Sequence, residues 1–272
     1  MGYITEFGQI HFKLKSGIPG WKSSKKCKTG LIMAKISDII KDTSHRPYQL
    51  PNGHWQYYQE WNEVLFLHWS IPVETIRKLI PKDLEIDTFK GKAYISLVPF
   101  SMKNTRPRYF PSIPLISDFH EINIRTYVSK NEVHGVLFLK IEAQKLISAI
   151  IARRLSGLPY KKSRIRRENG KYSSGNPEGG SRLHVEFKVG DVISAKSDLD
   201  KFLTERYCLF LEENNKIFRY DIHHKEWPLR SVKINMLEIS YKGEEIDQMA
   251  SMPEISHYSD GVKVLAWQRF SL

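Results

Sequence analysis

The sequence predicts an α+β fold made mainly of antiparallel strands, closed or nearly closed into one sheet. About ten short segments carry the alternation or the β-branched apolar runs of strands, and only a few carry a helical period. Strands do not alternate with helices along the chain, which argues against a parallel α/β sheet. The 272 residues are 41% hydrophobic and 12% aromatic, which suffices for a sizeable core.

The first half is expected to contain a strand, a helix and two hairpins. Glu63–Trp69 (EVLFLHW) is an apolar run typical of a buried strand. Pro72–Ile80 places its apolar residues on one helical face and begins with proline. Turn-forming residues then separate the paired segments of two expected hairpins, Leu84–Phe89 with Ala93–Val98 and Ile122–Val128 with Val136–Glu142.

The second half is expected to add one helix and further strands. Ala143–Leu155 has the pattern and length of a helix, and residues 163–180 are polar and turn-rich, with short strands at best. Leu183–Val189 (LHVEFKV) alternates strictly, as a half-buried strand does. Four later segments are also predicted as strands, namely Phe202–Leu211, Ile217–His223, Ser231–Tyr241 and Val262–Gln268.

One domain over residues 55–272 is the simplest organisation, preceded by a lead-in segment at residues 33–54. Residues 1–32 show no sustained period of either kind, and Met33 opens a stretch that reads like an ordinary bacterial protein start. We therefore expect residues 1–32 to be a disordered or mis-assigned N-terminal extension.

The formal net charge of +12 comes from two segments. Residues 1–32 carry six Lys and one Glu, and residues 153–172 carry eight Lys or Arg and one Glu. No apolar stretch approaches the roughly 18 residues of a membrane span, and no signal sequence follows the first Met. We expect a soluble cytoplasmic protein without a membrane partner.

Cofactor and metal motifs are missing from the sequence. Cys27 and Cys208 match neither a disulfide framework nor a zinc spacing. There is no Gly-rich phosphate loop and no HExxH, GxSxG or GxGxxG motif. The sequence therefore predicts no metal and no bound cofactor.

Two polar pairs in apolar surroundings are candidates for a pocket. Adjacent strand residues face opposite sides, so His223 and His224 are expected to place one ring in the core and one in solvent. His68 and His257 look isolated. Glu205-Arg206 lies in an apolar run (FLTERYCLF), so one of the two should point inward. Two interpretations stay open, a structural ion pair with Arg125 or Glu121, or a pocket lining.

The segment Arg153–Lys162 (RRLSGLPYKK) is the third candidate. Neighbouring cations and burial both favour a neutral Lys, which can form a Schiff base with a carbonyl compound. The simpler alternative is a solvated basic loop, and nucleic-acid binding through the phosphates is a third.

Several motifs together resemble one bacterial family. They are EWNEVLFLHWSIPVETIRKLIPKDLEIDTFKGKAYISLVPFSM, TRPR, FHEINIRTYV, FLTERYCLF and HHKEWPL. Over residues 55–270 the chain resembles the YqjF-like family, domain of unknown function 2071. That family is uncharacterised, so the resemblance names no reaction.

The resemblance extends to acetoacetate decarboxylase and its superfamily. IRKLIPKDLEID at Ile76–Asp87 is similar to LRKVVPEPLEID of that enzyme, and ARRLSGLPYKKS at Ala152–Ser163 is similar to its active-site segment GRELSAYPKKLG. The resemblance implies a closed, cone-like β-barrel with a central pocket. When the prolines are aligned, the Schiff-base Lys of the enzyme falls on Tyr160 and its neighbour on Lys161. A phenol cannot form an iminium, so classical acetoacetate decarboxylation is not expected unless a one-residue slip lets Lys161 or Lys162 take the role.

We therefore predict a central pocket for a small anionic or carbonyl ligand. If the protein is an enzyme, its action is lyase- or hydrolase-like on a keto or carboxylate compound. The alternatives are a non-catalytic binding or interaction protein on the same barrel and a nucleic-acid-associated protein acting through residues 153–172, which we rank last. Self-association into a homo-oligomer stays open. The candidate catalytic residues are Lys161, Tyr160 and Glu205, and the candidate substrate-binding residues are Arg153, Arg206, Arg125 and His223.

Overall fold

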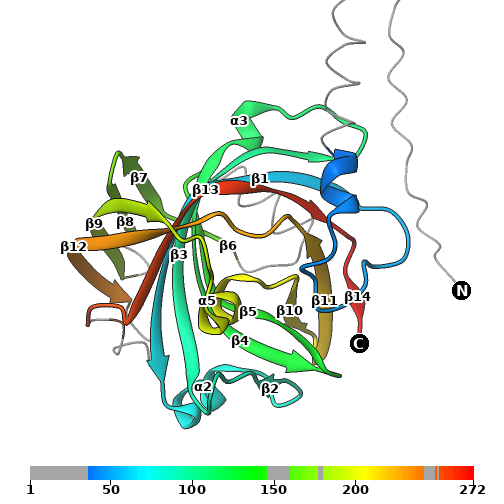
Figure 1. The fold of residues 1–272 in the computed structure, drawn as a ribbon, viewed down its shortest axis with the longest axis horizontal. Helices are drawn as coiled ribbons and strands as arrows, with labels where there is room; N and C mark the ends of the chain where they lie inside the picture. Colours follow the sequence, from blue (N-terminus) through cyan, green and yellow to red (C-terminus); the bar gives the residue numbers. More distant parts are fainter. Residues whose placement is uncertain (1–35, 146–159, 177–179, 242–248, 250) are drawn as a thin grey trace, which may run out of the picture. The chain divides into compact units, whose positions relative to one another are not determined.

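The computed structural model describes residues 36–145, 160–176, 180–241, 249 and 251–272. Contacts divide the chain into two units, Met1–Asp38 and Ile39–Leu272, and the fold described below is that of the second. Strands dominate it, and short helices lie among them (Figure 1). Among these helices are α2 (Val73–Leu79), α3 (Pro114–Ser117) and α5 (Asp198–Thr204).

One sheet of 14 strands contains every described strand. The strands are β1 (Tyr57–Ile71), β2 (Glu85–Ile86), β3 (Ala93–Pro107), β4 (Phe119–Lys130), β5 (Val133–Ala143), β6 (Tyr160–Lys162), β7 (Arg164–Glu168), β8 (Lys171–Asn176), β9 (Ser181–Val192), β10 (Cys208–Glu213), β11 (Lys216–His223), β12 (Leu229–Tyr241), β13 (Ile255–Ala266) and β14 (Phe270–Ser271).

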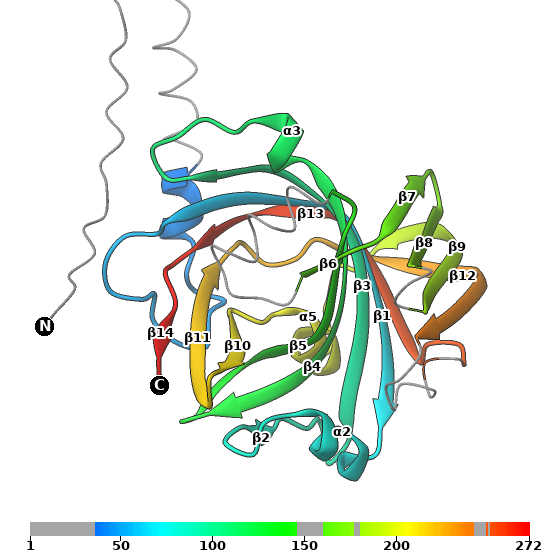
Figure 2. The same cartoon turned by 180° about the vertical axis from the view of Figure 1, so that it is seen from behind.

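The sheet closes on itself into a ring. The order β11-β10-β5-β4-β3-β1-β13 returns to its start because Ile222 of β11 pairs with Ala266 of β13. The β10–β5 contact is parallel and the other ring pairings are antiparallel. β12, β9, β8 and β7 extend from β13 as a side ladder, seen beside the ring in Figure 2. The mainly antiparallel, closed sheet predicted from the sequence is thus confirmed, as a strand ring rather than a regular barrel.

Two apolar clusters follow from the alternation of side chains along the ring strands. Leu65, Leu67 and Trp69 of β1 point outward and pack with side chains of the ladder, such as Val185 of β9. Val64 and Phe66 point inward and pack with residues of β3, β11 and β13. The ring therefore has a covered outer face and a largely apolar interior.

The helix α5 lies against the inner face of the ring (Figure 1). Ser197 and Asp200 form a capping box at its start, and its Leu203 packs among inward-facing side chains of β3, β4 and β5. This capping box explains an error in the sequence prediction. Phe202–Leu211 is not one strand, because Phe202–Thr204 complete α5 and only Cys208 begins β10.

The expected pairing of Leu84–Phe89 with Ala93–Val98 is also wrong. Gly91 sits at positive φ in the turn, but β2 pairs with β4 and only one bridge, Phe89 to Lys92, joins the two arms. The helix at Pro72–Ile80 and the pairing of Ile122–Val128 with Val136–Glu142 are confirmed by α2 and by β4–β5. The helix expected at Ala143–Leu155 falls outside the described residues from 146 onward, and Ala143 itself ends β5.

Candidate functional site

Tyr160 enters the interior of the ring through β6. This three-residue strand runs parallel to β5, with Tyr160 beside Ile141, and the Tyr160 ring packs against the inner apolar cluster. Its hydroxyl donates a hydrogen bond to Glu121 Oε2 at 3.0 Å. Lys161 and Lys162, the next two residues, are exposed. The position that the superfamily resemblance assigns to the Schiff-base Lys is therefore the one occupied by an inward phenol.

Glu121 is the acidic partner of Tyr160 and lies on the inner face of β4. Its side chain is almost completely buried, and this burial raises its pKa to about 7 even though hydrogen bonds from Tyr160 and Asn123 act in the opposite direction. Burial and the Glu121 charge raise the Tyr160 pKa well above its usual value. A carboxyl group that titrates near neutrality beside a phenol can give or take a proton at physiological pH.

Arg125 follows Glu121 and Asn123 on the same inner face of β4. Its residue exposure is 7%, its Nη2 donates to the Leu203 carbonyl at 3.1 Å, and its guanidinium lies over the Phe66 ring. Its Nε has no hydrogen-bond partner, and no carboxylate pairs with it among the described residues. A buried cation of this kind is costly unless an anion neutralises it.

Glu205 and Arg206 are structural in this geometry. Glu205 accepts hydrogen bonds from Lys196 Nζ, Tyr207 and the Trp227 backbone. The Arg206 guanidinium pairs with Asp87 at 2.5 Å, so the partners differ from the expected Arg125 and Glu121. Of the two open interpretations, these contacts favour the ion pair.

The two adjacent histidines are both buried, so the expectation of one solvent-facing ring is wrong. His223 Nε2 bonds the Ile39 carbonyl at 2.7 Å and its Nδ1 faces Arg46, and burial lowers its pKa to about 4. His224 Nδ1 donates to the Lys225 carbonyl. Both nitrogens of His223 are engaged, which leaves none for a ligand.

His68 and His257 are not isolated, contrary to the expectation. Their ring centroids lie 5.5 Å apart on the neighbouring strands β1 and β13. Sequence reasoning considered Glu121 only as a possible partner of the Glu205-Arg206 pair, did not consider Asn123, and did not place the two on one inward face. Their alternation in EINIRTY was the available signal, because Glu121, Asn123 and Arg125 occupy every second position opposite apolar residues.

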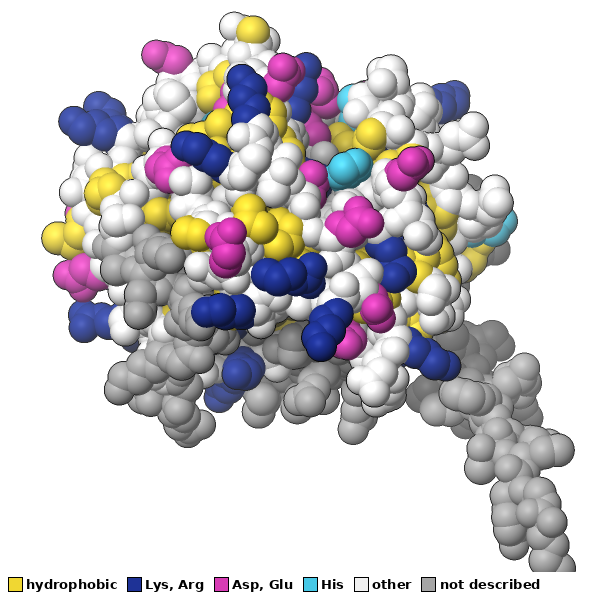
Figure 3. Space-filling model, turned by 90° about the horizontal axis from the view of Figure 1, so that it is seen from below, with side chains coloured by type: hydrophobic (Ala, Val, Ile, Leu, Met, Phe, Trp, Pro, Cys, Tyr) yellow, Lys and Arg dark blue, Asp and Glu magenta, His cyan; other side chains and the backbone are white. Residues whose placement is uncertain are grey.

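Arg153 and residues 153–159 of the basic segment lie outside the described residues. In the remainder, Arg164 and Arg166 are exposed, whereas Arg167 pairs with Glu63 at 2.8 Å. On the face seen in Figure 3, basic and acidic side chains are interspersed. No helix in the described part of the chain is long and apolar enough to cross a bilayer.

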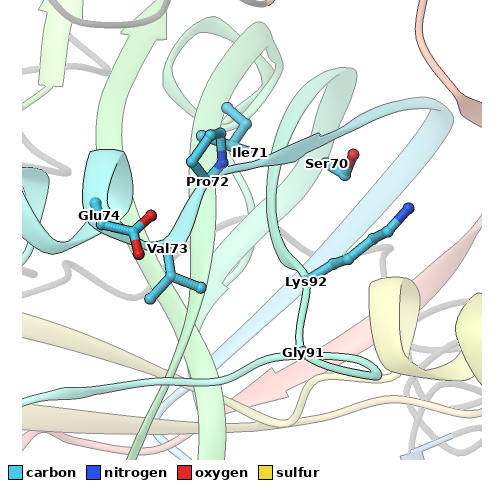
Figure 4. Close-up of a pocket in the computed structure, with 7 residues that line it drawn as sticks. All are labelled: Ser70, Ile71, Pro72, Val73, Glu74, Gly91 and Lys92. Carbon is cyan, nitrogen blue, oxygen red and sulfur yellow. The ribbon is translucent and has the colours of Figure 1, made fainter.

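A surface pocket of about 390 Å³ opens between the end of β1, the start of α2 and the turn at Gly91. Figure 4 shows Glu74 on the helix side and Lys92 on the turn side. The hydroxyl of Ser70, which also lines it, is held by Glu254. This pocket is not the central one that the sequence predicts.

Known proteins resemble this chain in sequence and in fold. A solved acetoacetate decarboxylase covers 86% of this chain and 97% of its own, with a TM-score of 0.53 and 12% identity. An acetoacetate decarboxylase-like enzyme from Sphingomonas wittichii RW1 covers 83% and 97%, with a TM-score of 0.53 and 14% identity. The enduracididine biosynthesis enzyme MppR covers 84% and 90%, with a TM-score of 0.53 and 11% identity. At these identities the likeness establishes the acetoacetate-decarboxylase-like fold alone.

The relatives found by sequence are more similar to this chain than these solved structures are. The uncharacterised protein YqjF of Bacillus subtilis (strain 168) is 35% identical over 228 residues, which are 80% of this chain and 93% of that protein. The DUF2071 family, described as an uncharacterised conserved protein, matches residues 58–263. The chain therefore belongs to the DUF2071 family.

Proposed function

We propose that the interior of the ring binds a small carboxylate that also carries a carbonyl group, without forming a Schiff base. The observation that carries this proposal is Arg125, a buried guanidinium with no carboxylate partner among the described residues. A ligand carboxylate supplies the missing counter-charge and accepts from the unpartnered Nε.

Glu121 and Tyr160 would meet the carbonyl end of this ligand. Alternate residues of a strand are about 7 Å apart, so the Cα atoms of Glu121 and Arg125 are separated by about 13 Å along β4, with Asn123 between them. The long side chains of Arg125 and Glu121 would have to shorten this span for a small keto acid to contact both. Below its pKa the Glu121 carboxyl carries a proton, which it can donate in a hydrogen bond to a carbonyl oxygen. The phenol of Tyr160 holds that carboxyl in place.

The absence of an inward Lys at position 160 supports a non-covalent mode. Lys161 remains a candidate only at the exposed edge of β6, because successive strand residues face opposite sides. The similarity to the decarboxylase and the decarboxylase-like enzyme named above therefore concerns the fold alone. The chemistry proposed for this chain rests on its own residues.

Calorimetric titration of the full chain with pentanoate and 4-oxopentanoate tests the proposal. We expect 4-oxopentanoate to bind about tenfold more tightly, since one hydrogen bond to its carbonyl is added. Arg125→Gln should weaken both acids about tenfold or more, and Glu121→Gln should reduce the advantage of the oxo group.

Arg164→Gln, at an exposed arginine of β7, is the matched control and should change neither affinity. Arg125→Lys retains the charge and covers the case in which Arg125→Gln does not fold. Equal affinities in wild type, Arg125→Gln and Arg125→Lys, or no binding of either acid, would overturn the proposal.

A further inference from the structure

The protonation of His68 follows from its hydrogen-bond chain. Tyr127 must donate its single proton to the Leu203 carbonyl, 2.8 Å away, because a carbonyl oxygen can only accept. Ser96 Oγ therefore donates to the Tyr127 hydroxyl at 2.7 Å. Since the Ser96 proton is used, His68 Nδ1 donates to Ser96 Oγ at 2.6 Å. The proton of the neutral His68 ring is thus on Nδ1.

His68 Nε2 is consequently a bare acceptor. The residue is completely buried, and burial lowers its pKa well below the ordinary value, so the ring stays neutral. Nε2 has no hydrogen-bond partner. A buried acceptor without a hydrogen-bond donor destabilises the ligand-free protein. A ligand group that donates a hydrogen bond to it removes that cost.

His257 presents a second bare acceptor next to it. Its Nε2 donates to Asp200 Oδ1 at 2.9 Å, so in the neutral ring the lone pair is on Nδ1. Nδ1 is also buried without a partner. Two nitrogens are fewer than the three or four protein ligands of a zinc site, and the described residues contain no larger group of metal ligands.

Both acceptors lie at the level of Arg125 inside the ring. His68 pairs with Ser96 across β1–β3, and Ser96 pairs with Arg125 across β3–β4, so all three face inward in one row. The positive charge of Arg125 helps to lower the pKa of His68. One end of the interior therefore combines a cation for a carboxylate with two acceptors for hydrogen-bond donors.

We infer that the ligand of the ring interior is a carboxylate with a hydroxyl or ammonium group at carbon 2, and that its carboxylate binds Arg125. An ammonium group can donate to both His68 and His257, whereas a hydroxyl, which has one proton, donates to one of them. This inference rests on the proposed function and adds a donor group at carbon 2 to its ligand, which still carries a carbonyl group further along its chain. A plain carboxylate leaves both imidazole nitrogens unmatched, and a site built for a donor discriminates against a ligand that lacks one.

Titration of the full chain with pentanoate and 2-hydroxypentanoate tests this specificity. Wild type should bind the hydroxy acid about tenfold or more tightly than pentanoate. His68→Asn retains an N–H donor toward Ser96 but removes Nε2, so it should reduce this preference several-fold. His54→Asn, at an exposed histidine, is the control and should retain the full preference.

His257→Asn is a second test of the same preference, because its amide can still donate to Asp200 while Nδ1 is removed. This variant also keeps the inference testable if His68→Asn does not fold. Equal binding of the two acids by wild type, or an unchanged preference in both Asn variants, would overturn the inference and would point to an ordered water at these nitrogens. The proposed function would survive that result if 4-oxopentanoate still bound through Arg125. Failure of all three acids to bind would overturn both.

Discussion

Glu121→Gln should change the dependence of stability on pH. The pKa of Glu121 is about 7 in the folded chain, against 4.5 for an unperturbed carboxyl. Between these values the folded chain holds a proton that the unfolded chain has released, so the free energy of unfolding of wild type falls as pH rises. The shift of roughly 2.5 units corresponds to a loss of about 3 kcal/mol between about pH 4.5 and pH 8.

Gln at this position is neutral at every pH, so the free energy of unfolding of the variant does not fall in this way as pH rises. Relative to wild type, Glu121→Gln should gain about 3 kcal/mol of stability as pH rises through that window. Urea unfolding of both proteins at half-unit pH steps measures the difference, and Glu212→Gln, at an exposed carboxyl of β10, serves as the control. A difference that stays flat from pH 4.5 to 8 would refute the assignment of a buried, proton-holding carboxyl.

Three further predictions concern other residues. Borohydride treatment with acetoacetate should leave the intact mass unchanged, because Tyr160 cannot form an iminium; a reduced adduct on Lys161 or Lys162 would restore Schiff-base chemistry. Arg206→Met should lower the free energy of unfolding by about 2 kcal/mol in urea titrations, because it leaves the half-buried Asp87 carboxylate with His134 as its remaining ion-pair partner, whereas a loss below about 1 kcal/mol would show that the pair is not structural. A chain that starts at Met33 should melt within a few degrees of the full chain, since residues 1–32 lack periodicity; a much larger drop by calorimetry would contradict this.

The elements with clear periodicity could be predicted from the sequence. The run EVLFLHW is the buried centre of β1, and the alternation of Leu183–Val189 is that of β9. Phe202–Leu211 was mispredicted because its apolar content resembles a strand, while the capping box that starts α5 precedes the segment at Ser197. The partner of β2 could not be predicted either, because pairing with β4 is a long-range choice that local turn chemistry does not encode.

The candidate site, like the fold, could be predicted only in part from the sequence. Tyr160 as the inward residue could be predicted from its place after Pro159 in the superfamily resemblance. Its contact with Glu121 could not, since it requires β6 to lie beside β5, which itself pairs with β4. His68 and His257 are far apart in sequence and meet only because β1 pairs with β13.

A crystal structure of the full chain with 4-oxopentanoate shows whether the ring interior binds this acid without a covalent bond. We expect an unlinked ligand inside the ring, with its carboxylate within hydrogen-bond distance of Arg125 and its ketone oxygen facing Glu121 and Tyr160. A ligand joined covalently to a lysine, or one bound only outside the ring, would contradict it.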